Sequence, residues 1–406
     1  MSKLNTMALD DQKELIRQCI EKNMSLASSL SERGLSYDNL GYETYQAKSD
    51  GKQCEPGLYQ PIESLTRYHD DIPAVSFFAG AGGLDIGFSY AGFKTIAAVE
   101  LVELFCDTLR HNSPNKIVIG PPTYSGNVSN HEEIANALKA AGIDKGFNGV
   151  FHGGPPCQPF SIASNQRFNK SGDNFKRKGF DDEEKGTLLF DYLWYITEFL
   201  PKAFLIENVG GLLELDADKK VSAALENLKN IGYSISEPTV INAAEYGVPQ
   251  NRNRCIILGV RGKHAPELPK KNEKLTPCGP VFERDLINAK NHVTREHAAQ
   301  SIERYMRLEY GSRDQLGRVD RLDPALPSKT VIAGGTKGGG RSHLHPYYPR
   351  TLSVRECARL QTFPDDYEFL GPVARQFTQV GNAVPPILAY KLALCIKAAL
   401  MNNEEA

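Results

Sequence analysis

Several common signatures are missing from this sequence. Its eight cysteines are scattered, and no two are spaced as C-x-x-C, which argues against a zinc site and against a thioredoxin-type redox pair. No run of about eighteen apolar residues occurs, so no membrane-spanning helix is expected. The first residues also lack the basic-then-apolar pattern of a secretory signal. We therefore expect a cytoplasmic protein with free thiols and no bound metal.

Acidic and basic residues nearly balance, but they are unevenly distributed along the chain. The formal net charge is −2. Residues 250–350 carry 19 Lys and Arg against 10 Asp and Glu, a formal +9, which leaves −11 for the remainder. A basic segment on an acidic chain indicates that this segment contacts a polyanion. A solvated, loop-rich surface would have the same composition, so charge alone leaves both interpretations open.

Short β-like runs alternate with helical patterns from Pro73 onward. This alternation predicts an α/β fold with an open, mostly parallel sheet covered by helices on both faces. Ligands of such sheets bind at the carboxyl ends of the strands. The predicted strands are 74–78, 94–99, 116–119, 150–152, 203–207, 233–241 and 255–260, and the helices between them include 103–110, 188–200 and 221–231.

The pattern differs on either side of this large domain, which we place at residues 71–260. Residues 1–70 are predicted to be an N-terminal extension, with helical spacing over residues 9–30 and Gly34 as its candidate end. Residues 261–350 are rich in Gly, Pro, Lys and Arg and predict a second, smaller domain. Residues 351–406 return to helical patterning, and we expect them to rejoin the large domain.

A glycine-rich turn, FFAGAGGL at residues 77–84, follows the first predicted strand. Glycines let the backbone turn sharply and approach a ligand closely. Glu100 closes the next strand, 17 residues after Gly83, a spacing at which a carboxylate can accept hydrogen bonds from a ribose. The turn is not G-x-G-x-x-G, which disfavours nicotinamide chemistry. Together the two features favour an adenosine-containing cofactor, whereas each alone fits an ordinary turn or a surface charge.

Cys157 and Glu207 are the candidate reactive groups. Cys157 stands within Pro155-Pro156-Cys157-Gln158-Pro159, and these prolines exclude a helix interior, so we expect an exposed cysteine at a strand end. A cysteine thiolate is a nucleophile. Glu207 ends the strand 203–207 and is placed to exchange a proton over the same pocket. The alternatives are a buried structural cysteine and an ordinary salt bridge.

Two arginines stand in the segment Gln250-Asn251-Arg252-Asn253-Arg254. Side chains at positions i and i+2 of an extended segment point the same way. Arg252 and Arg254 could therefore grip an anion or hold a carbonyl oxygen. A charged entry into the following strand is the alternative.

Taken in chain order, these motifs resemble those of the DNA (cytosine-5)-methyltransferase family. The resemblance covers about residues 74–400. It implies a Rossmann-like S-adenosylmethionine-dependent fold, with residues 71–260 as the catalytic and cofactor-binding domain and residues 261–350 as the target-recognition domain. The matching segments are FFAGAGGL, Glu100, GGPPCQPFS (153–161), GTLLFD (186–191), ENV (207–209), QNRNR (250–254), RECARLQTFPDD (355–366) and QVGNAVPP (379–386).

The resemblance implies a covalent mechanism on a cytosine that is flipped out of duplex DNA. Cys157 would attack C6 of the base as a thiolate, and Glu207 would engage N3 and the amino group. Arg254 would hold O2, and Arg252 would support the site. Transient addition at C6 makes C5 nucleophilic enough to accept a methyl group.

The resemblance also implies the cofactor and DNA contacts. Asn127-Val128 stand where the family usually has Asp-Ile or Asp-Val, and the asparagine carbonyl oxygen can still accept a hydrogen bond from the adenine amino group. Leu101 replaces an aromatic residue that is frequent in the family. The implied cofactor-binding residues are Phe78, Gly80, Gly82, Glu100, Asn127, Val128, Pro156, Leu188 and Asn382, and the implied DNA contacts are Ser161, Arg167 and Thr330.

The expected function is that of a bacterial modification enzyme. It would act in the cytoplasm as a monomer on double-stranded DNA, with a separate cognate restriction endonuclease as companion. One alternative is an RNA cytosine-5 methyltransferase of the same family, which carries a Cys-Phe-Thr stretch that this sequence lacks. A non-catalytic DNA-binding relative is disfavoured because the four candidate catalytic residues are present. A nicotinamide oxidoreductase is the remote alternative.

Overall fold

The computed structural model describes residues 7–47, 49–156, 188–214, 219–286, 289–333 and 343–404. Its internal contacts divide the chain into two compact units. Unit 1 comprises residues 1–63, 247–251 and 272–382, and unit 2 comprises residues 64–246, 252–271 and 383–406.

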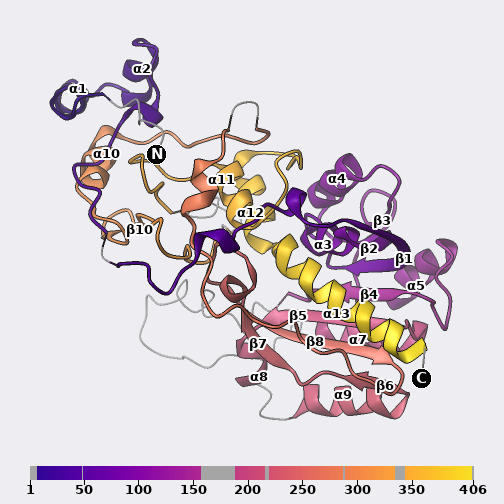
Figure 1. The fold of residues 1–406 in the computed structure, drawn as a ribbon. Helices are drawn as coiled ribbons and strands as arrows, with labels where there is room; N and C mark the ends of the chain where they lie inside the picture. The colour runs from indigo at the N-terminus through magenta and orange to yellow at the C-terminus, as the bar shows by residue number, and fades with distance from the viewer. Residues whose placement is uncertain are drawn as a thin grey trace, which may run out of the picture. The chain divides into compact units, whose positions relative to one another are not determined.

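An eight-stranded sheet forms the centre of unit 2 (Figure 1). Its order is β3-β2-β1-β4-β5-β8-β6, and β7 also pairs with β8. The first five strands in this order run parallel, whereas β8 is antiparallel to β5, β6 and β7. The α/β fold with a mixed, mostly parallel sheet is therefore confirmed. The strands are β1 (Tyr68–Phe77), β2 (Ala91–Val99), β3 (Ile117–Ile119), β4 (Val150–Gly153), β5 (Ala203–Val209), β6 (Tyr233–Ile235), β7 (Thr239–Asn242) and β8 (Asn253–Arg261).

The prediction of one strand over residues 233–241 is wrong, because β6 and β7 are separate. Pro238 stands between them and has no N–H to donate to a ladder. Ser236 donates its N–H to the Leu258 carbonyl, and its hydroxyl accepts the Leu258 N–H. These bonds replace the regular ladder where the strand is interrupted.

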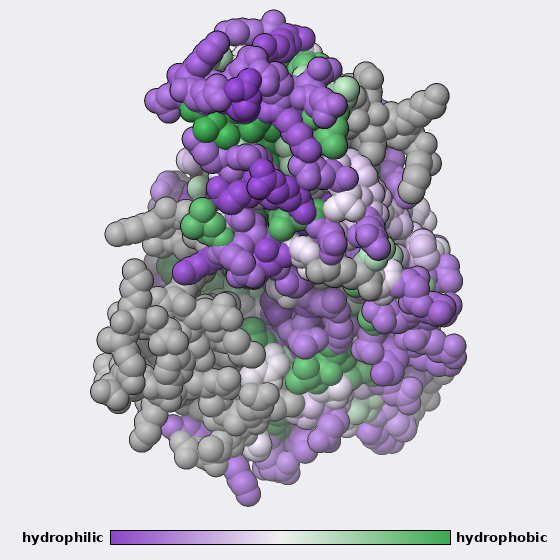
Figure 2. All heavy atoms as spheres, turned by 90° about the vertical axis from the view of Figure 1, so that its left-hand side faces the viewer, coloured by the Kyte–Doolittle hydropathy of each residue, from purple (hydrophilic) through white to green (hydrophobic). Residues whose placement is uncertain are grey.

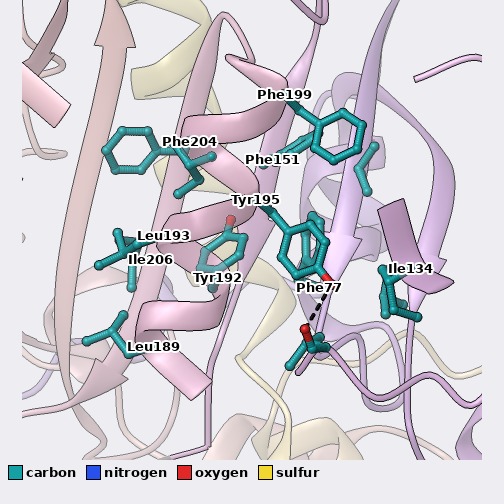
Figure 3. Close-up of a cluster of buried hydrophobic side chains, with 14 of the residues drawn as sticks. Phe77, Ile134, Phe151, Leu189, Tyr192, Leu193, Tyr195, Phe199, Phe204 and Ile206 are labelled. Atoms are coloured by element: carbon teal, nitrogen blue, oxygen red, sulfur yellow. Dashed lines mark hydrogen bonds between the residues drawn. The ribbon is translucent and has the colours of Figure 1, made fainter. Parts of the chain in front are cut away.

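Helices cover both faces of the sheet, as the sequence predicts. Successive strand residues point to opposite faces. Phe77 and Phe151 pack against helix α7, as Figure 3 shows, whereas Ser76 and His152 contact helix α3 on the other face. The first face carries α5 (His131–Ala140), α7 (Leu188–Phe199) and α9 (Lys220–Asn230), and the second carries α3 (Gly83–Tyr90), α4 (Glu103–Asn112) and α13 (Pro386–Glu404).

Unit 1 has little regular secondary structure. The single helix predicted over residues 9–30 is two helices, because the backbone leaves the helical region before Ser25 and Asn23 has a φ of 51°. The elements are α1 (Leu9–Glu21), α2 (Leu26–Ser31), α10 (Ala299–Met306), β9 (Arg313–Asp314), β10 (Val319–Asp320), α11 (Val354–Leu360) and α12 (Val373–Asn382), with short 3-10 turns such as Tyr37–Asn39 and Gly279–Glu283.

The N-terminal segment is part of the core of unit 1. Leu15 and Leu30 of the first two helices share an apolar cluster with Ile302 and Met306 of α10. The predicted segment 351–406 is divided between the units, since residues 351–382 group with unit 1 and residues 383–406 with unit 2.

Residues 373–404 have the length and apolar composition of a membrane span, although 67% of their most apolar window is buried. Such burial is typical of a core helix, and α13 packs along α3. On the face drawn in Figure 2, hydrophilic side chains predominate among the coloured residues, and the apolar ones form small separate patches.

Candidate active site

The parallel register of unit 2 places three predicted site residues, together with Gly154, along one edge of the sheet. Phe77 pairs with Val99 on one side and with Gly153 on the other, and Gly153 pairs with Ile206. The next residues along these strands are therefore Phe78, Glu100, Gly154 and Glu207. The first three directly follow the ends of their strands, whereas β5 continues past Glu207 to Val209. This is the edge where ligands of parallel sheets bind.

The glycine-rich turn after β1 adopts the conformation that its sequence predicts. Phe78, Gly80 and Gly82 have φ values of 52°, 55° and 74°, in the left-handed region that favours glycine. A Cβ on Gly83 would overlap the Val384 carbonyl oxygen. The segment that directly follows Asn382 therefore lies against the glycine turn.

The Glu100 carboxylate is buried and fixed at the end of β2. Its two oxygens accept the N–H groups of Gly80, at 2.7 Å, and Val102, at 2.8 Å. Burial raises the pKa of the Glu100 carboxyl, and these backbone N–H donors partly offset the rise. The Leu101 N–H is a third backbone donor to this carboxylate. Because a carboxylate offers about four lone-pair sites, it can still accept a further donor such as a hydroxyl.

The loop before α5 lies against the backbone of Glu100. Gly126 has a φ of 67°, and a Cβ there would overlap the Glu100 carbonyl oxygen. Only glycine allows this approach, which brings Asn127 next to Glu100. The Asn127 side-chain oxygen accepts the Ser129 N–H at 3.1 Å, while Val128 is buried in the main apolar cluster.

Leu188 and Phe78 pack against this same cluster. Leu188 is the first residue of α7. The hydroxyl of Tyr195, on the same helix, donates to the Val128 carbonyl at 2.8 Å. Three of the predicted cofactor residues, Phe78, Val128 and Leu188, thus share one apolar core.

Glu207 and Arg254 form an ion pair with 2.6 Å between Oε1 and Nε. The antiparallel pairing of β5 with β8 brings them together, since Val209 lies opposite Arg254. Both side chains are largely buried. A Cβ on Gly154 would lie 2.8 Å from the Glu207 carboxylate, so the chain passes close to this carboxylate three residues before Cys157.

Arg252 has a different partner from Arg254. Its side chain is 2% exposed and donates to the Ala383 carbonyl at 2.9 Å. The carbonyl oxygen that Arg252 holds therefore belongs to the protein itself. This bond connects the start of β8 to the segment that leads into α13.

In unit 1, Thr330 belongs to a network of hydrogen bonds that involves backbone and glutamine amide groups. Its hydroxyl donates to the Asn251 carbonyl at 2.6 Å, and the Val331 N–H donates to the Gln250 side chain at 2.8 Å. Gln250 also donates to Gln361 at 2.9 Å, which donates in turn to a main-chain carbonyl of α12. Sequence reasoning noted both glutamines within motifs but missed that they join the motifs together.

A buried polar group of side chains on the other face of the sheet was also missed. Asp85 accepts hydrogen bonds from Lys116 at 2.9 Å and from Ser76 at 3.1 Å. Among the described residues, His152 has both ring nitrogens without a hydrogen-bond partner, and it stacks on Phe88 at 4.2 Å. Burial lowers the pKa of His152 to about 4, so its ring is neutral. The only signal in the sequence is an acidic residue inside an otherwise apolar helix.

Three predicted residues, Cys157, Ser161 and Arg167, lie outside the described residues. Pro156, directly before Cys157, is exposed. Within the described ranges, no group of three or more His, Cys, Asp or Glu side chains is placed to hold a metal ion.

A family model and the relatives described below all point to the same family. A family model described as C-5 cytosine-specific DNA methylase matches residues 72–398. Type II methyltransferase M.PspPI of Psychrobacter sp. is 32% identical over 405 residues, which cover 92% of this chain and 88% of the relative. Type II methyltransferase M.NgoFVII of Neisseria gonorrhoeae is 32% identical over 377 residues, which cover 86% of this chain and 92% of the relative.

One solved structure is similar over most of this chain. It is a putative DNA modification methyltransferase encoded within an Escherichia coli prophage, with a TM-score of 0.64 and 25% identity. The match covers 82% of this chain and 99% of that protein.

Proposed function

Because the chain belongs to the C-5 cytosine-specific DNA methylase family and is a DNA cytosine-5 methyltransferase, we propose that it modifies one specific cytosine of duplex DNA through a covalent Cys157 adduct. The proposal includes flipping of the target base into the site. The observation that carries it is the Glu207–Arg254 pair, which lies beside the chain leading to Cys157.

The described residues of unit 2 fit S-adenosylmethionine as cofactor. The Glu100 carboxylate can accept a hydrogen bond from a ribose hydroxyl, since its backbone donors do not fill all of its about four lone-pair sites. In this proposal Asn127 and Val128 contact the adenine, and Leu188 and Pro156 line the same pocket. The turn with Phe78, Gly80 and Gly82 suits the methionine portion of the cofactor. Asn382, which groups with unit 1, stays a cofactor residue predicted from the sequence resemblance. When bound, this cofactor supplies the methyl group that C5 accepts.

The chain's own groups handle the base. The Cys157 thiolate adds to C6, and the ring electrons move towards C5. Glu207 holds N3 and the amino group, which favours this addition, and Arg254 holds O2 as a fixed cation. After methylation, the C5 proton leaves to a base, and the electrons of that C–H bond expel the thiolate. Arg252 keeps the start of β8 in place through Ala383.

Unit 1 supplies recognition in this proposal. Thr330 contacts the DNA near the flipped base, and Ser161 and Arg167 contact it from the segment after Cys157. The enzyme acts as a monomer in the bacterial cytoplasm and protects DNA from a separate cognate endonuclease. The relatives named as Type II methyltransferases support this role.

Methyl transfer from labelled S-adenosylmethionine to duplex DNA tests the proposal. Cys157→Ser is expected to lower turnover by at least about a thousandfold, because the hydroxyl is a far weaker nucleophile than a thiolate. Cys395→Ser, which removes a half-buried thiol from α13, is the matched control and keeps its activity. Unchanged turnover in the Cys157 variant would overturn the mechanism.

DNA that contains 5-fluorocytosine separates an enzyme from a binder, because only the enzyme forms a stable covalent adduct. The same assay with tRNA as substrate tests the RNA alternative: a covalent adduct with tRNA supports it, and the absence of an adduct rules against it. Bisulfite sequencing of host DNA then identifies the modified cytosine and its surrounding sequence.

A further inference from the structure

The loop of residues 125–130, which leads into α5, is held by hydrogen bonds and close backbone contacts in its first half. The Ser125 N–H and hydroxyl both donate to the Glu133 carboxylate. Gly126 lies against the Glu100 backbone, and the Asn127 N–H donates to the Ser125 hydroxyl at 3.2 Å. The loop is therefore held in one conformation where it lies next to Glu100.

Helix α7 holds the end of the same loop. Figure 3 shows Tyr195 of α7 with a dashed line from its hydroxyl, which donates to the Val128 carbonyl. Asp191, four residues earlier and so on the same side of the helix, accepts the Ser129 hydroxyl at 2.7 Å. Its other oxygen lies 2.8 Å from Nε2 of His131, the first residue of α5.

Asp191 is well suited to this fastening. Its side chain is 14% exposed, and hydrogen bonds to a carboxylate are stronger than those between neutral groups. It lies in the first turn of α7, where the helix dipole favours a negative charge. Leu188 begins that turn, so one carboxylate fixes Leu188 relative to the Asn127–Val128 loop.

We propose that Asp191 is a positioning residue that sets the adenine pocket of the cofactor by clamping Ser129 and His131 to the start of α7. This inference rests on the proposed function, in which Asn127, Val128 and Leu188 line that pocket. Asp191 acts through these residues and does not itself touch the base or the methyl group. Its loss weakens cofactor binding and leaves the chemical step intact.

The chain contains a natural reporter of this clamp. Its single tryptophan, Trp194, stacks on the His131 ring with centroids 4.2 Å apart and planes 4° apart. Tryptophan emission excited at 295 nm therefore comes from one side chain that is in contact with the clamped histidine. Binding of S-adenosylhomocysteine to the full-length protein is expected to change this emission.

Asp191→Asn tests the proposal in the full-length enzyme. The KM for S-adenosylmethionine and the Kd for S-adenosylhomocysteine are expected to rise about tenfold, since a charge-assisted bond is lost. The kcat at saturating cofactor and the Kd for duplex DNA stay within about twofold of wild type. A merely structural role would lower kcat or DNA affinity as well. Glu198→Gln, which removes a carboxylate from the same helix, is the matched control.

Ser129→Ala keeps the test decisive if Asp191→Asn does not fold. It removes one of the two clamped groups and leaves the His131 contact, so the KM for the cofactor is expected to rise about threefold. A wild-type enzyme that methylates DNA while both variants keep its KM overturns the positioning role alone. A wild-type protein without methyl transfer overturns the proposed function instead.

Discussion

The two units are stabilised by different kinds of core. In unit 2 the largest fully buried side chains are aromatic, such as Phe77, Phe151 and Tyr192, and they pack between the sheet and its helices. Among the described residues of unit 1, the largest fully buried side chains are four arginines. These are Arg321, Arg350, Arg355 and Arg359.

The buried arginines serve the backbone of a loop-rich region. Arg321 donates to the carbonyls of Thr44, Leu308 and Pro346, and its guanidinium lies 3.4 Å from the centre of the Tyr42 ring. Carbonyls outside helices and sheets need other partners when they are buried. Because a guanidinium has five N–H donors, one arginine replaces several ladder bonds. In unit 1, buried guanidinium groups therefore bind backbone carbonyls that in unit 2 would be paired within the sheet.

This difference changes how the basic composition of residues 250–350 is understood. Arg321 and Arg350 count towards its formal +9, yet both are about 1% exposed. Lys329 and Arg313 share the Asp320 carboxylate. Part of the positive charge of residues 250–350 is therefore buried or paired within unit 1. Only the remaining basic side chains are available to contact DNA.

The largest expected effect comes from Arg350, which pairs with the buried Glu356 carboxylate at 2.8 Å and also with Asp38. Arg350→Ala leaves Glu356 buried without its cation, so we expect a loss of about 3–5 kcal/mol in the free energy of unfolding. Urea unfolding measures the loss, and hydrogen exchange of peptides from unit 1 locates it. Arg350→Met combined with Glu356→Leu should recover much of it, because no buried charge remains. A loss of under about 1 kcal/mol would mean that the pair behaves like a surface salt bridge.

The next effect tests His152, a buried polar side chain in unit 2. His152 is neutral in the folded state, with its pKa lowered to about 4 by burial, whereas an unfolded histidine titrates near 6.5. The unfolded state therefore binds more protons between these values. Stability is full above about pH 6.5 and falls by about 3 kcal/mol as the pH drops towards 4.

Hydrogen exchange of unit 2 peptides across this pH range measures the effect. His152→Phe keeps a ring against Phe88 and should flatten the pH dependence in unit 2. An unchanged profile in that variant would assign the acid sensitivity to other groups.

The smallest effect compares helix caps, which depend on local bonds in either unit. Ser353 caps α11 by accepting the Glu356 N–H, and Asn130 caps α5 by accepting the Glu133 N–H. Ser353→Ala and Asn130→Ala should each cost about 1 kcal/mol. Thermal unfolding of the two variants gives the values. If only the cap in unit 1 mattered, the difference between the units would extend beyond their cores.

Sequence reasoning performs best where structure depends on local pattern. The glycine turn after β1, Glu100 after β2 and Glu207 after the run 203–206 each follow a stretch of apolar residues, so the edge with Phe78, Glu100 and Glu207 could be placed from the sequence. Pro238 is a local signal for the break between β6 and β7, whereas the bonds by which Ser236 reaches Leu258, 22 residues away, are not visible in any local pattern. The clamp at Asp191 likewise joins residues about 60 positions apart.

Unit 1 shows the same limit more strongly. The apolar spacing of α1 and α2 predicts a packing face but not its partner. That partner is α10, which lies more than 250 residues later in the chain. The role of Arg321 was equally hidden, since an arginine in a basic segment is ordinarily a surface residue.

The packing of α1 and α2 on α10 has a consequence for biosynthesis. A ribosome adds roughly 5–20 residues per second, so roughly 15 s to a minute passes between the synthesis of α2 and that of α10. During this interval the apolar side chains of Leu15, Ile16, Leu26 and Leu30 have left the ribosome without their packing partner. The helices α1 and α2 are thus made long before the helix that buries them, and the growing chain depends on this interval being short or chaperoned.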